Sequence, residues 1–243
     1  MKKAMASGGR HRPKGLHILF EDKDILVVDK AAGLLTMGTK TEKDRTAYAH
    51  LMNYVRKGNN KSRQRIFIVH RLDREVSGVL LFAKSDHAKT ILQERWKDAD
   101  KKYLAVVHGA LSEKAGTITS YLAENASHVV FSVSDKQKGK LSHTAYRVLA
   151  ETKTRSLVEI TLLTGRKNQI RVHFSDIGHP IMGDRKYGKT KDSGGRLALH
   201  AFSITFNHPV SGERITCEAP IPEYFNGLVG LPKCLKANEK GTS

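Results

Sequence analysis

Short apolar stretches with alternating or β-branched residues recur along the chain, separated by turn-forming Gly, Asn, Asp and Ser. Such stretches are typical of β-strands that are buried on one or both faces. They predict strands at His17–Glu21, Ile25–Lys30, Arg65–Val69, Gly78–Lys84, Tyr103–His108, Gly116–Leu122, Val129–Val133, Ser142–Ala150, Leu157–Leu163, Phe202–Asn207 and Arg214–Glu218. Helical periodicity predicts helices at Thr46–Arg56, Ala88–Trp96 and Lys167–Ile177.

Strands outnumber helices in this pattern, and few helices lie between successive strands. That order favours an α+β architecture with a mainly antiparallel sheet over a doubly wound α/β fold. The polar loops at 59–62 and 189–195 are too short to separate domains. We therefore expect one domain over residues 16–231, flanked by basic tails at 1–15 and 232–243.

The charge of the chain points to a polyanionic partner. Its 243 residues contain 42 Lys and Arg against 24 Asp and Glu, a net charge of +18. Self-repulsion of that size destabilises a compact chain unless a polyanion is present. Two internal groups stand out: the first basic cluster (Arg56, Lys57, Lys61, Arg63 and Arg65) and the second basic cluster, the basic residues between Arg166 and Lys191. Both suit a nucleic-acid backbone, although either alone also fits a solvated basic face.

Other classes of protein are disfavoured by composition. With 39% hydrophobic residues the chain can bury a core, which excludes a wholly disordered polycation. No apolar run is long enough for a membrane span, and the amino-terminal residues do not form an export signal. The two cysteines, Cys217 and Cys234, form no metal-binding spacing. We expect a cytoplasmic protein without a metal.

One motif match is misleading. Residues Gly183–Thr190 satisfy the phosphate-loop pattern G-x-x-x-x-G-K-[ST]. That motif works only between a strand and a helix whose amides cradle the phosphates. Neither neighbour fits here, and Asp184 would place a carboxylate beside those phosphates. We therefore do not expect an NTPase.

The most informative polar stretch is His70–Gly78, a loop between two predicted buried strands. Asp73 lies between Arg71 and Arg74, and neighbouring guanidinium groups favour an ionised carboxylate that can act as a nucleophile or base. A structural salt bridge within a turn explains the same charge pattern.

Two further stretches contain candidate binding residues. Arg166 precedes or opens the third predicted helix and Arg171 lies inside it, so one can serve a phosphate and the other a carboxylate. The alternative is a basic helix face with Ile170 and Phe174 toward the core. Tyr103, on a predicted strand, can stack on a nucleobase, or it is an ordinary core or interface tyrosine.

These blocks together resemble the RluA-type RNA pseudouridine synthases. The resemblance is carried in order by Phe20–Leu34, by His70-Arg-Leu-Asp73 with Ser77-Gly78, by the alternating strand Lys101–Gly109, and by Thr164-Gly-Arg, Gln169–His173 and Gly178–Gly188. It spans residues 20–225, which leaves only the tails outside.

The resemblance implies a single catalytic domain of the pseudouridine synthase fold that isomerises chosen uridines in ribosomal or transfer RNA. It implies that Asp73 is the essential catalytic carboxylate, acting on the ribose carbon or on a ribose proton. By the same resemblance, Arg171 pairs with Asp73, Tyr103 stacks on the target base, Ile170 packs against that base, and Arg71 helps to hold the nucleotide flipped out. Such an isomerisation needs no metal and no cofactor, and no obligatory protein partner is indicated.

The chain departs from the family pattern at Val76, Asn168 and the Ala31-Ala32 pair, where Thr, His and Pro are common. Only about 15 residues precede the first predicted strand, so we expect no amino-terminal RNA-binding domain. A catalytically silent RNA-binding protein with the same fold is the alternative hypothesis.

Overall fold

The computed structural model of the chain describes residues 13–39, 41–188, 195–232 and 235. Most of both predicted tails, and Lys189 and Lys191 of the second basic cluster, lie outside the described residues. The chain divides into two compact units, one formed by the residues up to Ala99 with Ala201–Ala219, the other by Asp100–His200 and the residues from Pro220 onward. We describe each unit by itself.

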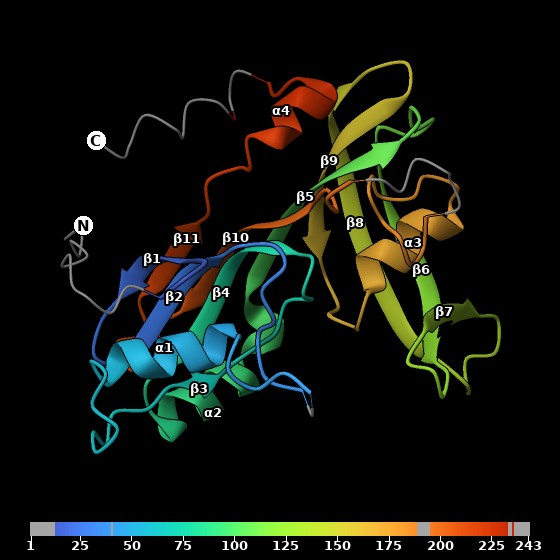
Figure 1. Cartoon of the computed structure of the whole chain (residues 1–243). Coiled ribbons are helices and arrows are strands. Elements are labelled where there is room, and N and C mark those ends of the chain that lie inside the picture. The colour runs from blue at the N-terminus through green and yellow to red at the C-terminus, as the bar shows by residue number, and fades with distance from the viewer. Residues whose placement is uncertain (1–12, 40, 189–194, 233–234, 236–243) are drawn as a thin grey trace. The chain divides into compact units, whose positions relative to one another are not determined.

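The sheet of the first unit contains antiparallel strand pairs (Figure 1). Strand β1 (Leu16–Glu21) pairs with β2 (Ile25–Lys30), and β2 pairs with β4 (Ser77–Ala83). The two-residue strand β3 (Phe67–Ile68) also pairs with β4, and β10 (Leu199–Asn207) pairs with β11 (Arg214–Glu218). Every residue of β4 is buried, which explains its unbroken apolar sequence.

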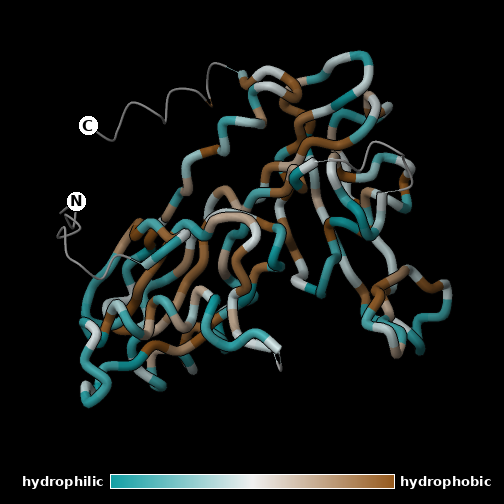
Figure 2. The backbone as a smooth tube through the Cα atoms, in the orientation of Figure 1, coloured by the Kyte–Doolittle hydropathy of each residue, from teal (hydrophilic) through white to brown (hydrophobic). Residues whose placement is uncertain are grey.

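Two capped helices flank this sheet. Helix α1 (Ala47–Val55) begins after Thr46, whose hydroxyl accepts a hydrogen bond from Ala49 N at 3.1 Å. Helix α2 (Asp86–Glu94) begins after Ser85, which caps it in the same way and extends it two residues upstream of the predicted start. A short 3₁₀ turn, η1 (Trp96–Asp98), follows α2. The apolar segments of the unit follow the strands in Figure 2.

The strands of the second unit pair antiparallel with one another. Its strands are β5 (Asp100–His108), β6 (Ala115–Glu124), β7 (Val130–Val133), β8 (Lys140–Glu151) and β9 (Arg155–Leu162), paired in the order β5-β9-β8-β6-β7. Helix α3 (Gln169–Asp176) packs on β6 and β7 through Val172, Leu122 and Val130. A short helix, α4 (Tyr224–Val229), buries Phe225 and Val229.

The predicted α+β class with a mainly antiparallel sheet is confirmed, and each predicted strand and helix has a counterpart. Two elements were not predicted, η1 and α4, because both are too short for a periodic pattern. The predicted third helix begins two residues later than expected, at Gln169, so Arg166 precedes it. The bounds of the single predicted domain, 16–231, stay a prediction.

Candidate active site

The loop that contains Asp73 connects β3 to β4 in the first unit and is fixed at its centre. Leu72, directly before Asp73, is buried. Its backbone N–H donates to Thr36 Oγ1 at 3.1 Å, and the Thr36 hydroxyl donates to the Leu72 carbonyl at 2.8 Å. A turn follows, in which Val76 N donates to Asp73 O at 3.2 Å. Asp73 is half-buried and held on both sides along the chain.

A buried lysine supports the far side of this loop. Lys30, at the end of β2, is fully buried, and its ammonium donates to the carbonyls of Ala31, Leu34 and Arg74 at 3.1, 2.8 and 3.3 Å. Burial lowers the pKa of Lys30 to about 8, although the negative charge of Asp73, the largest opposing influence, acts to raise it. With a pKa of about 8 Lys30 is mostly protonated at pH 7, and its positive charge interacts with the Asp73 carboxylate.

Two further features restrict the loop. His70, near the start of the loop, stacks on Trp96 with 4.5 Å between ring centroids, and its Nε2 accepts from Leu81 N at 3.1 Å. At the other end Gly78 has a φ of +112°, and a Cβ there would lie 2.1 Å from the Ala201 carbonyl oxygen. Only glycine fits that position, so backbone conformation and close packing explain the glycine of the Ser77-Gly78 pair.

The arginines beside Asp73 make contacts elsewhere in the unit. The exposed Arg74 donates from Nε to Gly33 O at 3.1 Å and lies 3.9 Å from the Glu42 carboxylate. Arg71 is exposed and contacts Met37 Sδ at 3.8 Å. Arg74 thus helps to anchor the loop, whereas the guanidinium of Arg71 is open to solvent.

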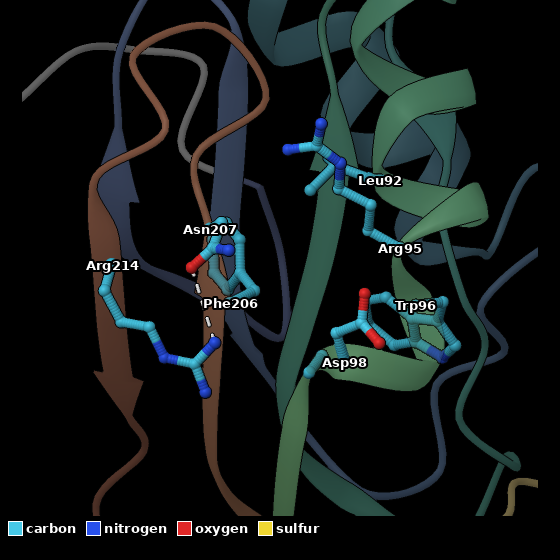
Figure 3. A pocket seen from close by; sticks show the side chains of 8 residues that line it. Leu92, Arg95, Trp96, Asp98, Phe206, Asn207 and Arg214 are labelled. Atoms are coloured by element: carbon cyan, nitrogen blue, oxygen red, sulfur yellow. Dashed lines mark hydrogen bonds between the residues drawn. The ribbon is translucent and has the colours of Figure 1, made fainter.

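A pocket in the first unit is lined in part by Trp96, the residue on which His70 of the Asp73 loop stacks. It is lined by Trp96 together with Leu92, Arg95, Asp98, Ala99, Phe206, Asn207 and Arg214 (Figure 3). None of the predicted catalytic or substrate-binding residues lines it. Its connection to the Asp73 loop is the stacking of Trp96 on His70.

In the second unit Arg171 is held by a buried carboxylate. Its Nε and Nη2 donate to the two oxygens of Asp184, both at 2.8 Å, and the side chains are only 8% and 0% exposed. Burial acts to raise the pKa of Asp184, but the bonds from Arg171 and from two backbone N–H groups outweigh it and lower this pKa. The Tyr187 ring centroid lies 5.2 Å from Arg171 Cζ.

The turn before α3 contains Asn168, one departure from the family pattern. Asn168 has a φ of +52°, a left-handed conformation that asparagine tolerates better than most residues. Its Nδ2 donates to Tyr187 Oη at 3.0 Å, and its Oδ1 lies 3.4 Å from Arg171 Nη1. Asn168 therefore contributes to the surroundings of Arg171.

The other predicted residues of the second unit differ in exposure. Ile170 is 5% exposed, in the buried first turn of α3. Tyr103 is half-buried on β5, opposite Ile160 of β9. Arg166 is exposed, and its backbone N–H donates to Gln169 Oε1 at 3.0 Å. Tyr103, Ile170, Arg171 and Arg166 thus belong to the second unit, and Asp73 and Arg71 to the first.

Sequence reasoning missed the residues that hold these side chains. The sequence assigns no partner to Asp184, which lies in the last block of the family resemblance and in the misleading phosphate-loop match, yet it is the bidentate partner of Arg171. The described part of the phosphate-loop match, residues 183–188, forms turns. Asp184 stabilises them, because its Oδ1 accepts hydrogen bonds from Lys186 N and Tyr187 N. Lys189 and Thr190 lie outside the described residues. A signal for Lys30 did exist, since a lysine that ends a strand of four buried apolar residues needs internal acceptors.

Comparison with known proteins shows the family. The model of the family described as RNA pseudouridylate synthase matches residues 24–176. The uncharacterized RNA pseudouridine synthase YlyB of Bacillus subtilis is 40% identical over 223 residues, 89% of this chain and 73% of that protein. The ribosomal large subunit pseudouridine synthase D of Pseudomonas aeruginosa is 34% identical over 233 residues, which cover 89% and 71% of the two chains.

Solved structures agree in fold. The human RNA pseudouridylate synthase domain containing 1 has a TM-score of 0.72 at 25% identity, with 98% of each chain covered. Human RNA pseudouridylate synthase domain containing 4 has a TM-score of 0.75 at 23% identity, covering 89% of this chain and 94% of that one. This chain belongs to the RNA pseudouridylate synthase family. It is an isomerase that converts uridine to pseudouridine in RNA, as its sequence motifs predicted.

Among the described residues, no helix is both long and apolar enough to cross a membrane.

Proposed function

We propose that this enzyme isomerises uridines of ribosomal RNA and that Asp73 is its catalytic carboxylate. Several relatives, including those of Pseudomonas aeruginosa and Nitrosomonas europaea at 34% and 35% identity, are named ribosomal large subunit pseudouridine synthase D. The observation that supports the role of Asp73 is that hydrogen bonds hold its loop in place. Thr36 bonds to the backbone of Leu72, and the Lys30 ammonium bonds to the carbonyl of Arg74. A carboxylate that acts on a sugar carbon or a sugar proton needs such a fixed position. A ribosomal substrate also accords with the cytoplasmic location expected from the sequence.

The reaction sets the tasks of the other residues. The C1′–N1 bond of uridine breaks, a C1′–C5 bond forms, C5 loses its hydrogen as a proton and N1 gains a proton, so that the product is an isomer of the substrate. A stacked uridine must first be extruded, which costs a few kcal/mol. We propose that Tyr103 stacks on the extruded base, that Ile170 packs against it, and that Arg71 and Arg166 bind the flanking phosphates. Arg171 serves the reaction as a cation for the Asp73 carboxylate.

Tritium release from RNA labelled at uridine C5 tests the proposal. Ribosomal and transfer RNA are assayed separately with wild type, Asp73→Asn, and Asp44→Asn as a matched control at an exposed carboxylate of the same unit. We expect wild type and the control to release tritium from ribosomal RNA, and Asp73→Asn to lose turnover by on the order of 10³-fold or more. Equal release by Asp73→Asn would refute the role of Asp73. Release from transfer RNA alone would refute the ribosomal substrate.

The alternative, a silent RNA-binding protein, makes an opposite prediction in the same assay. It requires tight binding with no tritium release from either RNA by wild type. The membership of the chain in an enzyme family does not favour this alternative.

A further inference from the structure

The first basic cluster lies on the loop that follows α1, and its charge is concentrated. Five cationic residues and no acid occur between residues 56 and 65. Four of the five, all except the half-buried Arg56, have exposed side chains: Lys57, Lys61, Arg63 and Arg65.

The loop is folded by its own hydrogen bonds. The Asn59 side chain accepts from Lys61 N at 3.0 Å, and the Asn59 carbonyl accepts from Ser62 N at the same distance. Arg56 Nε closes the loop by donating to Gln64 O at 3.2 Å. The exposed cations are therefore carried on a defined backbone.

These cations have no counter-charge within the described structure. The side chains of Lys57, Lys61, Arg63 and Arg65 make no ion pair or hydrogen bond with any other described residue. Like charges held close together on an ordered backbone repel one another, and a bound polyanion removes that repulsion. The substrate of this enzyme family is itself a polyanion, RNA.

We propose that the first basic cluster binds the sugar-phosphate backbone of the RNA substrate at nucleotides other than the one that is isomerised. One nucleotide carries one phosphate, so four exposed cations need the phosphates of several nucleotides as counter-charge. The cluster contributes affinity and not chemistry, because backbone contacts position a nucleic acid without reading its sequence. The inference rests on the proposed function only in requiring an RNA substrate.

A pair of matched variants tests the proposal. One changes all four exposed cations to glutamine: Lys57→Gln, Lys61→Gln, Arg63→Gln and Arg65→Gln. The control removes the same charge, two lysines and two arginines, from scattered exposed positions without described ion pairs: Lys23→Gln, Lys153→Gln, Arg45→Gln and Arg95→Gln. Kd and its salt dependence are measured for the RNA pool that wild type modifies, together with kcat and KM.

We expect the cluster variant to raise Kd and KM about tenfold or more, with kcat within about twofold of wild type. The slope of log Kd against log salt should fall by about 3, since each phosphate contact contributes about 0.7 to 0.9. The control should change KM less than about threefold. Equal effects of the two variants, or no effect of either, would overturn the proposal.

Lysine acylation of the wild-type protein gives a second measurement that does not depend on how a variant folds. RNA should protect Lys57 and Lys61 but not Lys23 and Lys153. Protection by phosphatidylglycerol vesicles and not by RNA would assign the loop to a membrane surface and overturn the proposal. Asp73→Asn can replace wild type here, so protection is measured without turnover. Because protection does not require turnover, this measurement distinguishes a wrong assignment of the ribosomal substrate from a wrong assignment of the first basic cluster as an RNA-binding site.

Discussion

The two basic clusters look alike in the sequence but differ in how the folded chain uses their charges. In the second basic cluster Arg171 is buried against Asp184, and Lys167 Nζ lies 2.6 Å from Glu124 Oε1. In the first basic cluster the four exposed cations have no such partner among the described residues. The count of cations along a chain therefore does not measure the charge available to a ligand. Acidic side chains that the fold places beside some of the cations neutralise part of that charge.

The largest expected effect concerns the buried pair of the second cluster. Asp184→Asn leaves the Arg171 guanidinium buried without its carboxylate, so we expect a loss of about 3 to 5 kcal/mol in the free energy of unfolding. Urea denaturation measures it. The control, Asp135→Asn, removes the partner of Lys138 in an exposed pair at 3.6 Å and should change stability by less than about 1 kcal/mol. Similar losses in both variants would contradict the distinction between buried and exposed charge.

A second prediction concerns His173 of α3, which makes the second unit sensitive to acid. Burial lowers the pKa of His173 to about 4, and its Nε2 lies 3.0 Å from Ser120 Oγ. Above its ordinary pKa of 6.5 the ring is neutral in both folded and unfolded chains. As the pH falls from 6.5 to 4, only the unfolded chain gains the proton, and stability falls by on the order of 3 kcal/mol.

Urea unfolding at pH 7, 5.5 and 4.5 checks this loss. Carboxylates titrate in the same range, so the measured quantity is the difference between wild type and His173→Gln. Parallel pH profiles for the two proteins would contradict the prediction. The first basic cluster contains no histidine and should contribute nothing to this difference.

A smaller effect is expected at the exposed pair of the second cluster. Lys167 and, to a lesser extent, His128 lower the pKa of Glu124 through hydrogen bonds. Lys167→Met should therefore raise the pKa of Glu124 toward its ordinary value more than His128→Gln does. NMR titration of the Glu124 carboxyl measures both shifts. A larger rise in His128→Gln would reverse the assignment.

The smallest effect on stability is expected for the first cluster itself. Because its four exposed cations have no described ion pairs to lose, the fourfold glutamine variant should stay within about 0.5 kcal/mol of wild type for each site. Thermal or urea unfolding decides this. A loss comparable to that of Asp184→Asn would mean that the cluster serves the fold, and the contrast between the clusters would disappear.

The regular elements were predictable because strand alternation and helix capping are local properties. The predicted strand Ile25–Lys30 matches β2 in both bounds, and Thr46 and Ser85 cap α1 and α2. Helix α4 was not predictable, since six residues carry no clear period and tertiary bonds hold it, such as Tyr224 Oη to Leu197 O at 2.8 Å.

The site was predictable where its residues form motifs, and not where the fold supplies their partners. The motifs predicted Asp73 and Arg171 as candidates. The partner of Arg171, thirteen positions along the chain, follows from a turn geometry that no local pattern encodes. The clamp of Thr36 on Leu72 joins residues 36 positions apart and is likewise a product of the fold.

Chemical modification of the buried Lys30 can report local unfolding of the Asp73 loop. When the backbone around it opens, the Lys30 amine loses the burial that lowers its pKa to about 8 and reacts as an ordinary lysine. Full burial keeps reagents away from it until the surrounding backbone separates. The rate at which Lys30 is acylated at pH 8 is thus governed by the frequency of local unfolding beneath the loop.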